Sequence, residues 1–497
     1  MPHEVIITSD RSLMSEYGYS IFVGFAACAP KLIPDFLYKL FLSPPVGNHN
    51  GIAEAAPCGT RKMEAALLEA GIDVVVAHPD HLDNVIDKNT KVVGITTNDP
   101  RGLGPASTTF SSLTRKRTFS AIFFEKTVKK IREVAKRRGN TSLKIIAGGP
   151  GAWQLADEKI LESYGIDCVL VGEGEITGVE IFKKALKGEP LPKIVYGETV
   201  PVEKIPSIKH RTISGLVEIA RGCGRGCKFC VPNLRIFRCR PIEKIMEEVE
   251  VNLREGAHEI LLHAEDVLRY GAQGPIPDES KVLELFGKVL EKTSKISISH
   301  FAFASVVSKP DLIPKLTQLL DSKTDAKFYS GQVGIETGSP RLMEKHMFGK
   351  VLPFKPEQWP EIVIEAHKIL ADHRWVPCST LISGLPGETA EDIRKTIELV
   401  QNLREYRSLI VPLFFVPLGG LEGGKFFSKE DMLPEHWMLM AECIKHDFKW
   451  VDDLAKDYLS DPFQRFFVRQ IVFRIFRRVL KKPIKLMEEG IDPTTAG

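Results

Sequence analysis

Three cysteines stand unusually close together near the middle of the chain. Cys223, Cys227 and Cys230 lie in the stretch "RGCGRGCKFCVP", residues 221–232. The chain has only nine cysteines in 497 residues, which is too few for a disulfide scaffold, and the other six are scattered. A tight group of thiols in such a chain predicts a metal site.

The spacing of the three cysteines distinguishes two kinds of metal site. Structural zinc sites usually pair Cys-x2-Cys with a second Cys or His pair downstream. No such pair follows here, since the nearest histidines, His258 and His263, fall on or near a predicted strand. Three thiolates with one open position instead suit a 4Fe–4S cluster whose fourth iron is free. Cys-x3-Cys-x2-Cys, with Phe229 before the last cysteine, resembles the radical S-adenosylmethionine (SAM) superfamily.

Two further motifs agree with this resemblance. "VGIETGS" (333–339) resembles the fourth-strand motif, whose glutamate meets the polar end of SAM, and "LISGLPGET" (381–389) resembles the fifth-strand turn beside the adenine. The alternative interpretations are an ordinary Gly-Pro turn before Glu388 and a helix-capping pair formed by Glu265 and Asp266. The resemblance implies a set of SAM-binding residues, namely Phe229, Glu265, Glu336, Gly384, Pro386 and Gly387.

The resemblance also implies a type of chemistry. In this superfamily the open iron binds the amino and carboxylate groups of SAM, and reduction by an electron donor yields a 5′-deoxyadenosyl radical that abstracts hydrogen from an unactivated carbon. Outside the motifs above, the sequence has no obvious Cys/His or paired-carboxylate arrangement, so we predict no further catalytic residue.

Alternating strand-like and helical segments predict an α/β protein. Short β-branched runs separated by amphipathic segments favour a Rossmann-like domain over residues 1–190, followed by a Pro-rich linker at 191–210. Six strand candidates in βα order predict a partial (β/α)6 barrel over 211–428, with the motif loops at the carboxyl ends of the strands. Residues 429–497 are expected to form a helical region.

Glycines at predicted strand ends suggest a second cofactor in the first domain. "GGP" and "GEGE" do not match Gly-x-Gly-x-x-Gly, so a dinucleotide is disfavoured. Together they resemble the cobalamin-binding domain fused to one class of radical SAM enzymes. The resemblance implies a set of cobalamin-binding residues: Asp99, Arg101, Ser107, Gly148, Gly149, Pro150, Gly172, Glu173, Gly174 and Glu175.

The residue below the cobalt is a separate question. Asp-x-His-x-x-Gly, which supplies a histidine ligand in other cobalamin proteins, does not occur, and "DPRGLG" (99–104) stands nearest to it. A charged Arg101 cannot donate a lone pair to cobalt. If Arg101 lay below the cobalt, the metal would therefore be weakly ligated. The alternative is a turn ion pair between Asp99 and Arg101.

Charge and hydropathy limit the partners. The 67 basic and 64 acidic side chains give a net charge of only +3, which favours no nucleic-acid partner, and no apolar stretch suggests a membrane span. We therefore expect a cytoplasmic protein. One local exception is the basic stretch 464–482, which includes Arg465 and Arg474. It is either a packed helix with a solvated basic edge or a surface for an acidic partner or a membrane.

The combined motifs imply a cobalamin-dependent radical SAM C-methyltransferase acting on an sp3 carbon. "APCGTRKMEAALLEAGIDVVVAHPDHLD" and "NDPRGLGPASTTF" resemble an archaeal subgroup from methanogens that modifies methyl-coenzyme M reductase, in which the α-carbon of a glutamine is methylated after translation. Two alternatives remain. One is a cobalamin-binding radical SAM enzyme acting on a lipid or small metabolite, and the other is a non-catalytic iron–sulfur scaffold or redox partner.

Overall fold

The computed structural model describes residues 3–17, 25–231, 236–458, 469 and 473–495. The chain divides into two compact units, one formed by Met1–Ile219 with Arg238–Leu262 and the other by Ala220–Phe237 with His263–Gly497. These units do not follow the domain boundaries expected from the sequence. Within the described ranges, no helix combines the length and the apolar character needed to cross a bilayer.

The first unit contains a six-stranded parallel sheet. Its strands are β1 (Val5–Ser9), β4 (Val74–Val76), β5 (Val92–Thr96), β6 (Lys144–Gly148), β7 (Cys168–Val171) and β8 (Ile194–Tyr196). They lie in the order β4-β1-β5-β6-β7-β8. Such an order has a topological switch point between β1 and β5, where ligands of doubly wound sheets bind outside the carboxyl ends. β8 lies inside the segment expected to be a linker.

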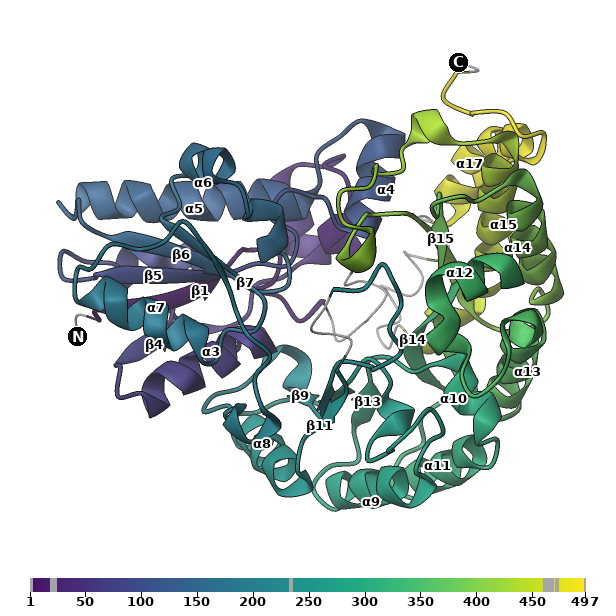
Figure 1. Ribbon diagram of the computed structural model, residues 1–497, viewed down its shortest axis with the longest axis horizontal. Helices are drawn as coiled ribbons and strands as arrows, with labels where there is room; N and C mark the ends of the chain where they lie inside the picture. The colour runs from purple at the N-terminus through teal and green to yellow at the C-terminus, as the bar shows by residue number, and fades with distance from the viewer. Residues whose placement is uncertain (1–2, 18–24, 232–235, 459–468, 470–472, 496–497) are drawn as a thin grey trace. The chain divides into compact units, whose positions relative to one another are not determined.

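Helices cover both faces of this sheet. Figure 1 shows α5 (Phe119–Arg137) and α6 (Glu158–Tyr164) on one face, with α3 (Cys58–Glu69) and α7 (Thr177–Leu186) on the other. Ile6 packs with Phe124 of α5, whereas the next residue, Ile7, packs with Phe182 of α7. Because successive strand residues point to opposite faces, a sheet covered on both sides needs continuous apolar runs. This explains the β-branched segments of the first unit.

Every strand predicted for the barrel is present. The strands are β9 (Leu216–Glu218), β12 (Ile260–His263), β13 (Ile296–Ile298), β14 (Tyr329–Glu336), β15 (Trp375–Ser383) and β16 (Leu409–Phe414). β9, and β12 up to Leu262, belong to the first unit, together with α8 (Ile242–Arg254). In the second unit, β14, β15 and β16 form a parallel sheet in that order.

The second unit places helices between its strands, as predicted. They are α9 (Glu279–Leu290), α10 (Phe303–Ser308), α11 (Leu312–Asp321), α12 (Pro340–Val351), α13 (Trp359–Asp372) and α14 (Ala390–Asn402). Along β14, Val333 and Ile335 are buried, whereas Gln332 and Gly334 are partly exposed. Trp359 of α13 donates a hydrogen bond from Nε1 to the carbonyl of Ile335 at 3.1 Å. One face of β14 therefore lies under helices, and its other face is open to ligands.

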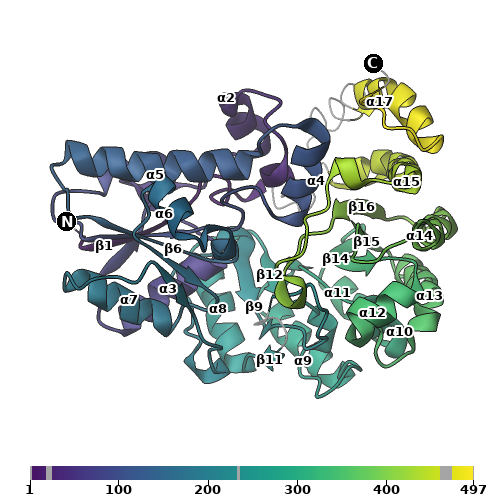
Figure 2. The same ribbon diagram turned by 45° about the horizontal axis from the view of Figure 1, so that its top comes forward.

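The C-terminal part of the chain is helical, as expected. α15 (Pro434–Tyr458) packs against α14 and β16, and α17 (Phe473–Glu488) lies beside α15 (Figure 2). The exposed basic side chains of α17 include Arg474, from the stretch predicted to be a basic helix. The first part of that stretch, with Arg465, lies outside the described residues.

Candidate functional site

The cysteine loop belongs to the second unit and is built on glycines. Gly222, Gly224 and Gly226 have φ of 72°, 68° and 70°, in the left-handed region that glycine adopts without strain. Within the loop the Cys230 amide donates to the carbonyl of Cys227 at 3.1 Å. In the described residues no three His, Cys, Asp or Glu side chains converge on one ion. This is compatible with a 4Fe–4S cluster, in which each thiolate binds a different iron.

The three thiols differ in pKa, and each must lose its proton to bind a cluster as a thiolate. A hydrogen bond from the Cys230 thiol outweighs burial and lowers the pKa of Cys227 to about 7. The hydrogen bond that Cys230 donates to Cys227 raises the pKa of Cys230, and burial raises it further. Burial also raises the pKa of Cys223. The three thiols interact electrostatically, so the structure brings the predicted cluster ligands together.

Buried ion pairs and hydrogen bonds hold the loop in place. The Arg225 guanidinium donates from Nη2 to Asp266 Oδ2 at 2.9 Å, and the Ser305 hydroxyl donates to the same oxygen at 2.6 Å. Arg269 donates from Nη1 to the carbonyl of Cys223 at 2.7 Å. Asp266, considered as a capping residue from the sequence, thus positions the cysteine loop. Arg225 lies inside the cysteine motif and Arg269 follows the second barrel strand, but the sequence does not reveal the contacts that either side chain makes.

Glu336 lies beside the cysteine loop, where the predicted SAM motif requires it. It ends β14 with φ of 64°, an uncommon conformation for a residue with a side chain. Its Oε1 atom accepts from Lys350 Nζ at 2.8 Å. Burial alone would lower the pKa of Lys350, but the Glu336 carboxylate and the Cys227 thiolate together raise it, so the amine is an ammonium. A Cβ at Gly334 would overlap the Glu336 carboxylate, which explains the glycine at this position.

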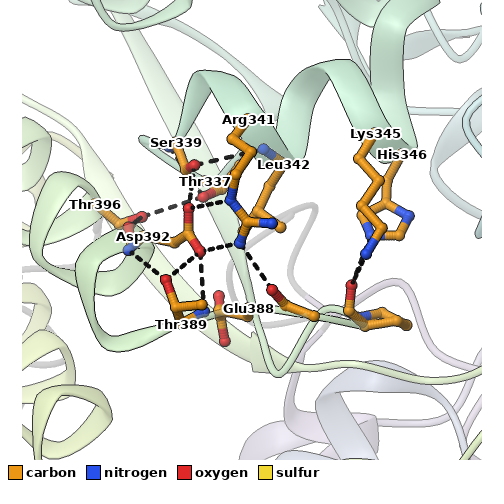
Figure 3. Close-up of polar contacts among 12 residues, drawn as sticks. Thr337, Ser339, Arg341, Leu342, Lys345, His346, Glu388, Thr389, Asp392 and Thr396 are labelled. Carbon is orange, nitrogen blue, oxygen red and sulfur yellow. Dashed lines mark hydrogen bonds and ion pairs between the residues drawn. The ribbon is translucent and has the colours of Figure 1, made fainter.

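Helix α12 connects the cysteine loop to the predicted adenine turn (Figure 3). Arg341 Nη2 donates to the carbonyl of Gly387 at 2.7 Å, and His346 Nε2 lies 2.9 Å from the carbonyl of Pro386. The carbonyl of His346 accepts from the amide of Lys228, between two of the cluster cysteines, at 2.9 Å. One helix therefore holds both loops, and Asp392 anchors it by an ion pair with Arg341.

Gly384 offers a test of the adenine turn. Its φ is 87°, and an added Cβ would overlap the Phe427 ring. We expect Gly384→Ala to lower the free energy of unfolding by about 1–3 kcal/mol and to weaken SAM binding, measured by urea unfolding and calorimetry. The matched control is Gly287→Ala on α9, where no atom lies within 4 Å of the new Cβ. Gly287→Ala should raise the free energy of unfolding by up to about 1 kcal/mol and bind SAM as wild type does. If the two variants had the same free energy of unfolding and the same SAM affinity, the predicted role of this turn in SAM binding would be wrong.

The two remaining SAM-binding candidates also lie in the second unit. Phe229 is half-buried within the cysteine loop. Glu265 follows β12 and interacts electrostatically with Cys223. The structure thus gathers the three cysteines, Glu265 and Glu336 around one loop, and α12 connects this group to the turn at Gly384–Gly387.

The cobalamin-binding candidates gather at the carboxyl edge of the first unit's sheet. Thr96 and Gly148 are paired at the ends of β5 and β6, so the loops that follow them are neighbours. Gly149 has φ of 99°, and an added Cβ would lie 2.7 Å from the carbonyl of Thr97, so this glycine permits close packing of the protein's own backbone. The Glu173 carboxylate accepts from Arg238 Nη2 at 2.6 Å.

The loop after β5 does not contain the ion pair between Asp99 and Arg101 that the sequence offered as an alternative. Within the described residues Arg101 and Asp99 form no ion pair. Arg101 Nη1 donates to the carbonyl of Gln154 at 3.1 Å, and Asp99 accepts from Gln154 Nε2 at 2.7 Å and from the Gly104 amide at 2.9 Å. Gln154 therefore organises this loop.

A buried hydroxyl at the same edge lacks a partner. Ser107 lies in the first turn of α4 (Pro105–Thr114), is fully buried and has the Cys28 thiol as its neighbour. The next residue, Thr108, has no hydrogen-bond partner for its Oγ1 atom among the residues that the structure describes. Buried polar atoms without partners are rare in native proteins unless a water or ligand satisfies them. These residues fit a bound polar group next to the switch point.

Asp10 is a buried carboxyl at the switch point that the sequence reasoning missed, because β1 was not among the predicted strands. It follows β1 and accepts from the Ser12 amide at 3.0 Å and from the Thr97 hydroxyl at 3.2 Å. Burial outweighs these hydrogen bonds and raises its pKa from 3.8 to about 6. The stretch "VIITSD" has the same form as "VVGITTND" before Asp99, which could have revealed the strand.

The raised pKa of Asp10 predicts how stability depends on pH. Because the native state binds the Asp10 proton more tightly than the unfolded state, the free energy of unfolding should fall as pH rises from 3.8 to about 6. This contribution amounts to about 3 kcal/mol. Asp10→Asn removes it, so urea unfolding should show the variant gaining stability relative to wild type across this range. A difference between the two proteins that does not change with pH would refute the prediction.

Comparisons with known proteins agree with the geometry of the second unit. Residues 217–400 match the family model of the radical SAM superfamily. An uncharacterised protein of Methanopyrus kandleri is 27% identical over 73% of either chain. One from Methanocaldococcus jannaschii is 26% identical over 59% of this chain and 66% of that protein. The tRNA-2-methylthio-N(6)-dimethylallyladenosine synthase of Petrotoga mobilis is 28% identical over 60% of this chain and 64% of its own length.

One solved structure resembles the fold over most of the chain. It is the radical SAM methyltransferase TsrM from Kitasatospora setae, solved with tryptophan substrate and a SAM analogue. The TM-score is 0.52 with 13% sequence identity, covering 82% of this chain and 72% of that one. The family match and the cysteine loop together imply a 4Fe–4S cluster and SAM as cofactors. Residues 217–400 are therefore a radical SAM domain.

Proposed function

We propose that this protein is a cobalamin-dependent radical SAM methyltransferase that methylates an unactivated sp3 carbon. The observation that carries the proposal is the grouping of the three cysteines with Glu336 and Lys350 in one buried site. The parallel sheet of the first unit supports the cobalamin part, because its switch point carries the unpartnered Thr108 hydroxyl and the predicted glycine loops.

The chain's own residues have defined parts in this proposal. Cys223, Cys227 and Cys230 would hold the 4Fe–4S cluster, and Glu336 would orient SAM by accepting hydrogen bonds from its polar end. Lys350 would hold the Glu336 carboxylate in place through their ion pair. When bound, the cluster and SAM supply a radical that takes hydrogen from carbon, and cobalamin supplies a transferable methyl group.

The proposed substrate is a glutamine in methyl-coenzyme M reductase, methylated at its α-carbon. The motifs shared with the archaeal subgroup support this choice, and the two relatives from methanogens are compatible with it. An external electron donor would be required. The relatives named as tRNA-modifying synthases support a second candidate, modification of an adenosine in tRNA.

Anaerobic reconstitution distinguishes these functions. The protein, loaded with iron, sulfide and cobalamin, is incubated with dithionite, SAM carrying a labelled methyl group, and a reductase peptide that contains the glutamine. We expect a mass increase of one methylene on a glutamine carbon, together with S-adenosylhomocysteine and 5′-deoxyadenosine, by mass spectrometry. Unmodified tRNA serves as the competing substrate.

Each alternative predicts a different result in this assay. Label in tRNA but not in the peptide would favour the second candidate. 5′-Deoxyadenosine without transfer of the label to any protein or RNA would favour action on a lipid or small metabolite. Absence of 5′-deoxyadenosine from a fully loaded protein would support a non-catalytic iron–sulfur scaffold and would refute the proposal.

A further inference from the structure

Three polar side chains gather at the strand ends next to the cysteine loop. His263 ends β12, His300 follows β13, and Gln332 lies on the open face of β14. The rings of His263 and His300 are 5.8 Å apart between centroids and inclined at 73°. His300 and Gln332 are bridge partners in parallel register, so their side chains point to the same side. None of the three is required by the motifs described above.

The hydrogen bonds of His263 fix its tautomer. The Ser299 hydroxyl has a single hydrogen, which it donates to the carbonyl of Ala264 at 3.2 Å. The Ser299 oxygen must therefore accept the contact from His263 Nδ1, at 2.9 Å. In the neutral ring Nδ1 carries the hydrogen, so Nε2 is a hydrogen-bond acceptor. Nε2 has no partner among the described residues.

His300 presents a second unused nitrogen. Its Nδ1 atom is buried and has no hydrogen-bond partner in the described part of the chain, while Gln332 interacts with the same ring. Burial lowers the pKa of His300 to about 4, so the ring is neutral at pH 7. A buried nitrogen left without a partner costs about 1–3 kcal/mol. A ligand group that pairs with it would remove this cost.

The patch adjoins the radical site. Glu265, which follows His263 by two residues, interacts electrostatically with both His300 and Cys223. Glu265 therefore lies within electrostatic range of both this patch and the cysteine loop. A substrate held there would reach toward the predicted SAM site without displacing any residue assigned to the cluster.

We propose that His263, His300 and Gln332 form the substrate subsite for a neutral amide group, such as a peptide bond or a glutamine carboxamide. An amide both donates and accepts, so its N–H can bond to Nε2 of His263 or Nδ1 of His300 while its oxygen accepts from Gln332. A carboxylate would be repelled by Glu265, and an ammonium has no acceptor for the Gln332 donor. The choice of a polypeptide rests on the proposed function.

Binding can be tested without catalysis. In the full-length, cluster-loaded protein with ¹⁵N-labelled histidine, N-acetylglutaminamide is titrated while the ring nitrogens are observed by NMR. We expect shifts at Nε2 of His263 and Nδ1 of His300, and smaller ones with matched glutarate or butylamine. Equal shifts with all three probes, or stronger shifts with butylamine, would overturn the assignment to amides, and no shift with the amide would overturn the subsite.

Kinetics supply a second test. Gln332→Met and His300→Phe keep side-chain size but remove hydrogen-bonding groups. We expect each to raise the KM for the peptide about tenfold, with SAM cleavage in the absence of peptide unchanged within about twofold. Gln401→Met, on the exposed side of α14, is the control and should match wild type. Unchanged KM in both variants would overturn the subsite. If wild type binds the amide probe but methylates no peptide, the proposed function fails and the subsite stands.

Discussion

Cys227→Ser is expected to lose SAM cleavage altogether. Serine cannot supply the thiolate that the cluster requires, and Cys227 has the lowest thiol pKa of the three ligands, about 7. After anaerobic reconstitution the variant should bind much less iron than wild type. 5′-Deoxyadenosine formation with dithionite and SAM should fall to background, as measured by chromatography.

A matched cysteine separates loss of the cluster from loss of the fold. Cys239→Ser changes a half-buried cysteine of β11 (Arg238–Cys239) outside the triad and should retain both iron and SAM cleavage. The unfolding transition of Cys227→Ser should lie close to that of wild-type protein stripped of iron. If Cys227→Ser still cleaved SAM at the wild-type rate, Cys227 would not be a cluster ligand.

The strands of the second unit were predictable because each is a compact apolar run between helices with clear ends. Glu336 and Gly384 were placed at the ends of those strands by the resemblance of "VGIETGS" and "LISGLPGET" to motifs of the superfamily. The first unit was predicted less completely. β1 was missed although "VIIT" is apolar, and with it Asp10 at the switch point was missed. β8 was missed because a three-residue strand among prolines resembles a linker.

Residues that act by contact with a motif left no signal in the sequence. Lys350 reaches Glu336 from the far end of α12, and Arg225 reaches Asp266 across 41 positions. Such long-range pairs depend on how the strands and helices pack, which local patterns do not encode. Ser107 was predicted to bind a ligand, but its contact with the Cys28 thiol is visible only in the folded chain.

Asp266→Ala is expected to give the largest loss of stability. The Arg225 and Asp266 side chains are 6% and 1% exposed, so removing the carboxylate leaves a buried guanidinium without its counter-ion. Breaking such a pair from one side costs about 3–5 kcal/mol. Urea unfolding should show this loss, and iron incorporation should fall as well because Arg225 lies between two cluster cysteines. Glu284→Gln, in an exposed helix pair, should leave the free energy of unfolding close to that of wild type.

A double-mutant cycle tests whether the pair itself is responsible. Arg225→Met leaves Asp266 without its buried cation, although the Ser305 hydroxyl remains hydrogen-bonded to it. The double variant with Asp266→Leu removes both charges, and apolar replacement of a whole buried pair is often close to neutral. Its loss of stability should therefore be smaller than the sum of the two single losses. Additive losses would mean that the two side chains stabilise the cysteine loop independently, through Ser305 and the carbonyl of Lys350 rather than through each other.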